Sequence, residues 1–291
     1  MSNGGEHPTS LDARFLKIGA SLSAGTIAVS VYDYLSGFRW HHNGARWFHA
    51  ASTIKLAILA AVFDAIDAGR FTAGSRVHVR NRFVSVVGGH PFRVQPGRDA
   101  NSVVYGALGR TMRIGELAHH MIATSSNLAT NLLLDVVGVA EARQALTRRG
   151  LGGIDLQRGV EDERAFEAGC NNRVTADGVL QLLQAIRDAS GFSAAASSAM
   201  LEMLFDQQFS GGIGPGLPEG VRAVARVAHK TGDISTVSHD AGLVFLPGRP
   251  PYVVVILTES GGEAADRTAA VTSISRAVYE AIAAEGETAC R

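Results

Sequence analysis

The stretch from residue 52 to residue 68 constrains the fold most, because apolar side chains occupy nearly every face of the helix that it predicts. A helix of this kind is stable in water only when other elements cover most of its sides. The apolar run at 50–63 is interrupted by three polar residues and is too short to span a bilayer. We therefore expect this helix inside a protein core, and no membrane partner.

The rest of the chain predicts strands near both ends and helices in the middle. An amphipathic helix is predicted over 9–22, and strands over 25–34 and through Phe38 and Trp40. Further helical patterns lie at 114–122, 127–137, 140–149, 175–189 and 193–205. A Gly- and Pro-rich loop at 210–220 is followed by strands at 223–230, 241–246 and 252–258 and by a helix at 267–284.

This order of elements predicts an α+β fold in which both ends of the chain build one antiparallel five-stranded sheet flanked by helices. The middle of the chain would form an all-helical lobe. We expect residues 1–48 and 219–291 in the sheet domain and residues 49–218 in the helical domain. The cleft between the two is the expected place for a functional site.

Charge and cysteine content exclude several classes of partner. Lys+Arg and Asp+Glu both number 27, so no global field attracts polyanions, and we expect no nucleic-acid partner. The two cysteines, Cys170 and Cys290, make neither a disulfide framework nor a tetrahedral metal site. We expect no metal, no organic cofactor and a monomer. The N-terminus has no signal-peptide pattern, which predicts a cytoplasmic protein, or a secreted or periplasmic one if the N-terminus has been trimmed.

Lysine is scarce in this chain. Of the 27 basic residues only Lys17, Lys55 and Lys230 are lysines. Arginine keeps its charge under all ordinary conditions, whereas a buried lysine can lose its proton and act as a base. Lys17 lies in a predicted surface helix, so Lys55 and Lys230 are the candidates for amine chemistry.

Three short motifs would meet at the cleft. The first, Ser52-Thr-Ile-Lys55, begins the apolar helix, where the three-residue spacing lets the amine reach the hydroxyl and the helix N-terminus favours a developing anion. The second, Ser125-Ser-Asn127, precedes a helix. The third, Lys230-Thr-Gly232, is predicted to end a strand. Two amines in one cleft should lower each other's pKa, and the apolar helix should lower that of Lys55 further.

These motifs and their order resemble the penicillin-recognising serine hydrolases, most closely the class A β-lactamases. The resemblance covers nearly the whole chain. It implies that Ser52 is the acylated nucleophile, Lys55 its proton acceptor and Ser125 the proton relay to the leaving amine. The substrate-binding residues that it implies are Tyr105, Asn127, Lys230, Thr231 and Asp233, of which the last would supply a backbone N–H to the oxyanion hole together with Ser52.

The base for deacylation is less clearly marked. In class A enzymes a loop glutamate orients the water, and Glu161 lies at about the corresponding distance before the helix at 175–189. The family's usual Glu-x-x-Leu-Asn pattern is absent, and Glu163 and Glu167 are alternatives. A solvated acidic loop without a catalytic role is a further alternative.

Two positions depart from the family pattern. Ser126 stands where class A enzymes typically have aspartate, and Asp233 stands where they have a small or hydroxylated residue. A carboxylate of Asp233 that points into the cleft would repel an anionic β-lactam and favour a substrate with a cationic group.

The sequence therefore predicts a class A-type serine β-lactamase that opens a β-lactam amide through an acyl-serine intermediate. One alternative is an amidase, esterase, D-peptidase or transacylase that uses the same scaffold on a related acyl substrate. A second alternative, from another class, is a β-lactam-binding sensor that is acylated without turnover. Ser52 and Ser125 acting only as helix caps is the non-enzymatic interpretation.

Overall fold

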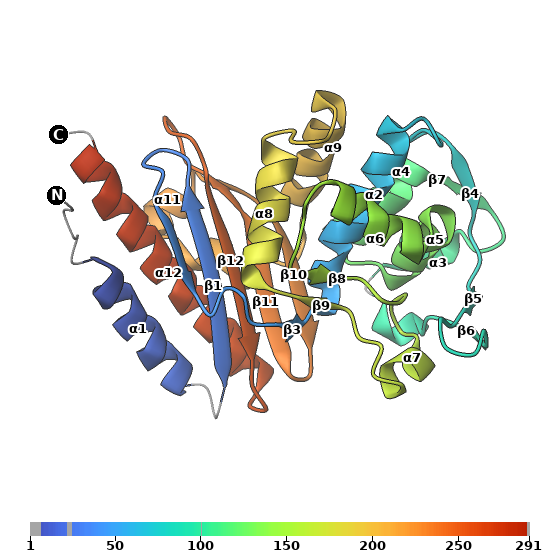
Figure 1. Cartoon of the computed structure of the whole chain (residues 1–291), viewed down its shortest axis with the longest axis horizontal. Helices are drawn as coiled ribbons and strands as arrows, with labels where there is room; N and C mark the ends of the chain where they lie inside the picture. The colour runs from blue at the N-terminus through green and yellow to red at the C-terminus, as the bar shows by residue number, and fades with distance from the viewer. Residues whose placement is uncertain (1–6, 22–24, 100, 290–291) are drawn as a thin grey trace.

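The computed structural model describes residues 7–21, 25–99 and 101–289. A five-stranded sheet stands between two layers of helices (Figure 1). Two helices from the chain ends cover one face, and the helical block from the middle of the chain lies on the other side. This arrangement is the one that the order of elements predicts.

The sheet is antiparallel throughout, with the strand order β10-β11-β12-β1-β2. Its strands are β1 (Thr26–Asp33), β2 (Arg39–His42), β10 (Arg226–Ile234), β11 (Val237–Phe245) and β12 (Tyr252–Glu259). β12 is the middle strand, and every residue from Tyr252 to Thr258 is buried. The expected central strand, covered on both faces, is confirmed.

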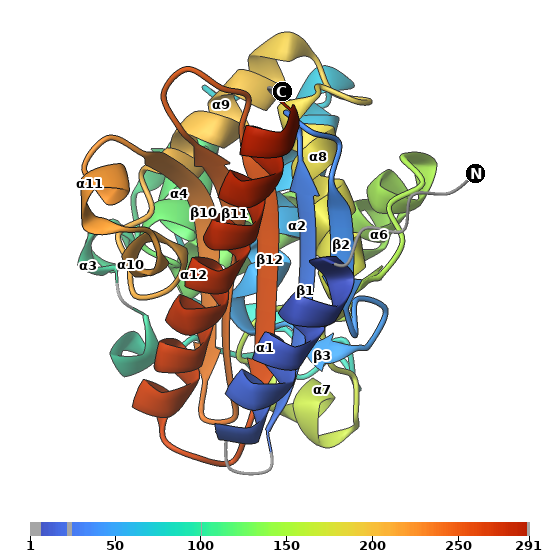
Figure 2. The same cartoon turned by 90° about the vertical axis from the view of Figure 1, so that its left-hand side faces the viewer.

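Helices α1 (His7–Ser21) and α12 (Ala264–Ala289) cover the outer face of the sheet (Figure 2). The core between them and the sheet contains Phe15 and Ile274, both fully buried, packed against side chains such as Val29 of β1 and Ile256 of β12. Of the predicted first helix, Leu22 lies outside the described residues.

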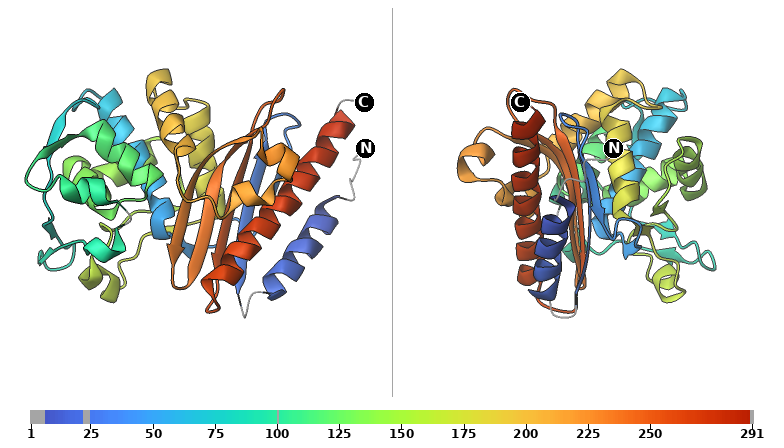
Figure 3. Two further views of the ribbon diagram at one scale, coloured as in Figure 1. Left: turned by 180° about the vertical axis from the view of Figure 1, so that it is seen from behind. Right: turned by 60° about the vertical axis from the view of Figure 1, so that its left-hand side comes forward.

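The inner face packs against α8 (Ala176–Arg187) and, beyond it, α2 (Ile54–Asp67) (Figure 3). Eleven of the fourteen residues of α2 are buried. The expectation that this apolar helix lies inside the core is therefore confirmed. A single hydrophobic cluster joins α2 to inner-face residues such as Ala228, Val255 and Leu257.

The remaining elements build the helical block and its connections. The helices are η1 (Ala51–Thr53), η2 (Pro96–Arg98), α3 (Ser102–Gly106), α4 (Ile114–Ala123), α5 (Asn127–Val137), α6 (Val139–Arg148), α7 (Glu163–Glu167), α9 (Ala194–Phe205), α10 (Ile213–Gly216) and α11 (Glu219–Arg222). Short strands are β3 (Phe48–His49), β4 (Arg76–His78), β5 (Phe83–Val84), β6 (Pro91–Phe92), β7 (Thr111–Arg113), β8 (Ile154–Asp155) and β9 (Arg173–Val174). None of the helices in the described ranges is long and apolar enough to cross a membrane.

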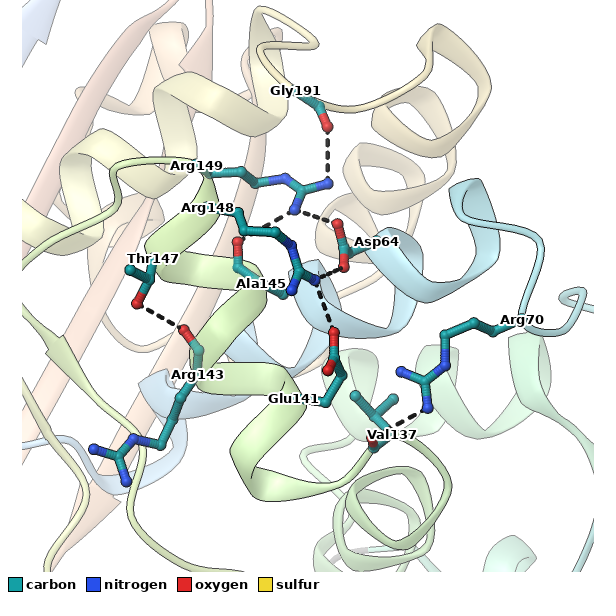
Figure 4. A network of polar contacts seen from close by, with 10 residues as sticks. All are labelled: Asp64, Arg70, Val137, Glu141, Arg143, Ala145, Thr147, Arg148, Arg149 and Gly191. Atoms are coloured by element: carbon teal, nitrogen blue, oxygen red, sulfur yellow. Dashed lines mark hydrogen bonds and ion pairs between the residues drawn. The ribbon is translucent and has the colours of Figure 1, made fainter.

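A partly buried carboxylate fixes the C-terminal half of α2 to the end of α6. Asp64 forms ion pairs with both Arg148 and Arg149, and the Arg148 Nη2–Asp64 Oδ2 distance is 2.9 Å (Figure 4). Arg148 also pairs with Glu141, and Arg149 donates to the Gly191 carbonyl. The position of α2, and hence of its N-terminal end, is thus set by charge as well as by apolar packing.

Three expectations about local structure were wrong. The predicted loop at 210–220 contains the short helices α10 and the start of α11, because Ile213 is buried in the core against α12. Lys230 lies in the middle of β10 rather than at its end. The strand predicted at 241–246 begins four residues earlier, at Val237. The division into two domains stays a prediction.

Because β10 packs closely on β11, a larger side chain at Gly242 should destabilise the fold. A Cβ there would lie 2.5 Å from the His229 Cβ and 2.6 Å from the Ala228 carbonyl oxygen. Gly242→Ala should lower the free energy of unfolding by about 1–3 kcal/mol through overpacking. Gly220→Ala, where nothing lies within 4 Å of the new Cβ, is the matched control. Equal urea midpoints for the two variants would contradict this packing.

Candidate active site

One pocket brings together residues from all three motifs. Ser52, Ser125, Asn127, Thr231 and Asp233 line it. The other lining residues are Arg98, Phe209, Gly211, Gly212, Ser238, His239, Thr268 and Val271. The pocket thus lies between the sheet edge formed by β10, the start of α12 and the helical block.

Ser52 lies in the 3-10 turn η1, directly before α2. The preceding residue, Ala51, has the left-handed φ of 44°, a conformation that costs energy for a residue other than glycine. Gly232 of β10 faces this turn, and a Cβ on it would lie 3.2 Å from the Ser52 backbone nitrogen and 3.1 Å from that of Thr53. A glycine at this position therefore lets the sheet edge approach the serine.

The Lys55 amine is completely buried and makes three hydrogen bonds. It donates to the Ser125 carbonyl oxygen at 2.6 Å, to Asn127 Oδ1 at 2.7 Å and to Ser125 Oγ at 3.1 Å. Within the described residues, no hydrogen bond joins this amine to Ser52 Oγ. The direct contact that the three-residue spacing predicts is absent, because the buried amine bonds to acceptors of the helical block.

Both charge states of this amine fit these partners. A carbonyl and an amide oxygen can only accept, so they use two N–H groups, whereas the Ser125 hydroxyl can either accept or donate. A neutral amine can therefore donate twice and use its lone pair for that hydroxyl. Burial, and next the charge of Lys230, lower the pKa of Lys55 well below its ordinary value, against a smaller opposite effect of Asp99 and Glu161. The expected direction of the shift is confirmed.

Lys230 lies on the same strand as Thr231 and Gly232, and β10 continues four residues beyond it. Its amine is buried and donates to the Thr231 carbonyl at 2.9 Å. Burial lowers the pKa of Lys230 to about 7, and the carboxylate of Asp240 opposes this shift. The Thr231 side chain lines the pocket.

Glu161 is the loop acid that contacts the lysine's partners. Its Oε1 accepts from Asn127 Nδ2 at 2.8 Å and its Oε2 from the Gln95 backbone N–H at 2.9 Å. Its φ of 61° is left-handed. By contrast, Glu163 pairs with Arg98 at 3.0 Å and is exposed, as is Glu167. Geometry favours Glu161 among the three acids that the sequence left open.

Asp233 is exposed and lines the pocket, which is the position considered for it from the sequence. Its Oδ1 accepts from Ser238 Oγ at 2.7 Å. The neighbouring pocket walls remove part of the hydration of this carboxyl and so raise its pKa, although the Ser238 hydrogen bond and the charge of Arg267 oppose the shift. A carboxylate therefore stands beside Thr231 in the same pocket.

Tyr105 is not among the residues that line the pocket. It lies on the short helix α3, and its hydroxyl donates to the Val94 carbonyl at 2.9 Å. Burial raises its pKa to about 12. Tyr105 therefore does not line the pocket, whereas Phe209 does, and the substrate-binding role of Tyr105 stays a prediction.

Several pocket residues were not predicted from the sequence. His239 is buried, its Nε2 lies 2.9 Å from the His49 carbonyl oxygen, and its Nδ1 accepts from the Thr258 backbone N–H at 3.1 Å. Burial lowers its pKa to about 4, so this imidazole is neutral and acts as a bridge between β11 and the strand before η1. Buried polar residues within an otherwise apolar strand were the signal available for Ser238 and His239.

No group of three or more His, Cys, Asp or Glu side chains in residues 7–21, 25–99 and 101–289 could hold a metal ion. Cys170 is a free thiol, and Cys290 lies outside the described residues.

The antiparallel sheet with its helical lobe is the fold of the β-lactamases and DD-peptidases. A sequence profile of the Beta-lactamase enzyme family matches residues 11–282, and the chain therefore belongs to that family. The chain is 24% identical over 273 residues to Beta-lactamase CARB-4 of Pseudomonas aeruginosa, an alignment covering 92% of this chain and 88% of that protein.

Solved structures of similar proteins have the same fold. A PBP-A variant in its acyl-enzyme complex with penicillin G has a TM-score of 0.80 at 26% identity, covering 95% of this chain and 97% of that one. A β-lactamase from Sphaerobacter thermophilus has a TM-score of 0.78 at 28% identity, covering 95% and 98%. The fold class and the family resemblance that the sequence predicted are confirmed.

The depressed pKa of Lys230 predicts a pH dependence of stability. The unfolded lysine keeps its proton up to about 10.4, whereas the folded one releases it near 7. Between these values the unfolded state binds more protons, so stability rises with pH. The free energy of unfolding, measured with urea, should rise less between pH 7 and pH 9 in Lys230→Met than in the wild-type protein. The same rise in both proteins would contradict a buried, readily deprotonated Lys230.

Proposed function

We propose that this protein is a serine hydrolase that opens the amide of a β-lactam through an acyl-Ser52 intermediate. The observation that carries the proposal is the buried Lys55 amine, which is held by Ser125 and Asn127 beside the pocket that Ser52 lines. Family membership and the acyl-enzyme complex of the similar PBP-A variant support the same chemistry.

In the acylation step, Ser52 Oγ attacks the lactam carbonyl carbon, and its proton passes to the neutral amine of Lys55, directly or through the Ser125 hydroxyl. The backbone N–H groups of Ser52 and Asp233 stabilise the oxyanion. When the C–N bond breaks, Ser125 donates a proton to the leaving nitrogen and is reprotonated by Lys55. Asn127 holds the acyl side-chain amide, and Lys230 and Thr231 bind the substrate's acidic group.

In the deacylation step, Glu161 takes a proton from a water molecule that attacks the ester carbonyl. As the ester C–O bond breaks, the proton that Glu161 took from the water passes to Ser52 Oγ, and the opened β-lactam leaves as an acid. Contact of Glu161 with Asn127 supports this role, because it locates the carboxylate next to the amide that also binds Lys55.

A burst experiment with a chromogenic cephalosporin tests the proposal. Sustained turnover that Ser52→Ala abolishes is the expected result. One equivalent of product with a stable adduct of matching mass would instead indicate a non-turnover sensor. No reaction with the cephalosporin, together with cleavage of simple esters, would indicate a hydrolase of another acyl substrate.

Glu161→Gln tests the second step. The amide side chain can keep the bonds to Asn127 and Gln95 in part but cannot accept a proton from water. Deacylation should slow by about 10²–10⁴-fold, so that intact-mass spectrometry detects accumulated acyl-enzyme. Glu163→Gln is the matched control and should deacylate normally. Normal deacylation by the Glu161 variant would make the assignment wrong.

Asp233 bears on substrate preference. Its carboxylate lies in the pocket where the substrate's acidic group would bind, so it should disfavour anionic penicillins. Asp233→Ser should lower KM for benzylpenicillin by about fivefold, the factor that corresponds to about 1 kcal/mol of repulsion. A neutral ester substrate should show no such change. An unchanged KM for the penicillin would refute this role.

A further inference from the structure

Residues 95–99 and 101 make hydrogen bonds with Glu161, with Asn127 and with the end of α4. The Gln95 backbone N–H binds Glu161, and the Arg98 carbonyl accepts from Asn127 Nδ2 at 3.1 Å. Asn101 donates to His120 and Thr124 on and after α4. None of the three sequence motifs includes these residues.

Asp99 makes the most concentrated set of these contacts. Its Oδ2 accepts from Ser126 Oγ at 3.0 Å and from the Leu128 backbone N–H at 2.8 Å, while its Oδ1 accepts from the Asn101 backbone N–H at 3.0 Å. The carboxylate is half-buried, and Ser126 is fully buried. It therefore fixes the N-terminal end of α5 from outside that helix.

Ser125 directly precedes the residues that Asp99 contacts, and its φ of 55° is left-handed. Such a conformation is unfavourable for a residue other than glycine and persists only when its surroundings hold it. Asp99 holds the residues that follow, Ser126 and Leu128, and a negative charge at a helix N-terminus is favourable. Ser126 itself has no charge to contribute, so the carboxylate has to come from another segment.

We propose that Asp99 is a positioning residue for acylation, which supplies from a separate segment the carboxylate that holds Ser125 and Asn127 against the Lys55 amine. This inference rests on the proposed function of Ser52. Asp99 touches neither the substrate nor Lys55 by a hydrogen bond among the described residues, and it acts through Ser126 and the first turn of α5.

The charge of Asp99 also has a measurable effect on Lys55. The charged groups that act on this amine are Lys230, which lowers its pKa, and Asp99 and Glu161, which raise it. Asp99→Asn should therefore lower the pKa of Lys55 and move the acidic limb of the acylation rate to lower pH. If Asp99 only stabilised the fold, Asp99→Asn would reduce the amount of active protein and leave the acidic limb of the pH profile unchanged.

The test combines acylation kinetics with lysine NMR on the full chain. Because the chain has three lysines, [ε-¹³C]lysine labelling gives one signal each for Lys17, Lys55 and Lys230. Asp99→Asn should slow acylation by a chromogenic cephalosporin by about ten- to hundredfold, the loss of one hydrogen bond to a charged group. It should also lower the titration midpoint of Lys55. Asp188→Asn, at the C-terminal end of α8, where the carboxylate accepts a hydrogen bond from the Tyr34 hydroxyl, is the matched control.

Two further variants keep the proposal falsifiable if Asp99→Asn folds poorly. Ser126→Ala removes one contact but no charge, so it should slow acylation without shifting the Lys55 midpoint. The exchanged variant Asp99→Ser/Ser126→Asp keeps one carboxylate and one hydroxyl in contact, and it should recover both rate and midpoint toward the wild-type values. An unchanged rate and midpoint in Asp99→Asn, or no recovery in the exchange, would overturn the proposal.

Failure of the proposed function is distinguishable from failure of this inference. If the wild-type protein is not acylated at all, the serine-hydrolase proposal fails, whereas the NMR midpoint still reports whether Asp99 acts on Lys55. If the wild type is acylated and Asp99→Asn behaves like Asp188→Asn, the function stands and the inference is wrong.

Discussion

The structure depends on the burial of one amine. Lys55 lies in the first turn of an apolar helix that is largely buried, and a lysine there would be strongly destabilising if its N–H groups had no acceptors. Ser125 and Asn127 supply these acceptors from the start of another helix. The two helices are thereby fixed relative to each other at the pocket, and the amine is held where its proton is easily lost.

Holding that amine requires local conformations that chains usually avoid. Among the described residues, five non-glycine residues have a left-handed φ, and Ala51, Ser125 and Glu161 are three of them. Each lies in or directly beside one of the three segments that meet around Lys55 and Ser52. Backbone strain is tolerated where surrounding contacts over-determine it, and here Asp99, Gly232 and Asn127 provide such contacts. The strained backbone conformations therefore lie next to the candidate catalytic residues.

The sequence predicted the elements that periodicity and motif spacing control. The burial of α2, the central strand β12 and the meeting of Ser52, Ser125 and Thr231 in one pocket follow from such patterns. It did not predict the early start of β11, because Ser238, His239 and Asp240 are polar residues that break the apolar pattern where the strand faces the pocket. It also missed Asp99 and Phe209, since loop residues far apart in the chain reach the site only through tertiary structure. The role that the family resemblance implies for Tyr105 stays a prediction, since this residue does not line the pocket and its hydroxyl donates to the Val94 carbonyl.

The most direct test of the account is the protonation of Lys55 in the substrate-free wild-type protein. A pH titration of the [ε-¹³C]lysine signals, with that of Lys55 assigned by its loss in Lys55→Arg, measures this. The account predicts a midpoint for Lys55 well below about 10.4, the ordinary value for lysine, so that the amine loses its proton more easily than an exposed lysine does. A midpoint at or above that ordinary value would contradict it, because the amine would then be a permanent cation and could not accept the serine's proton.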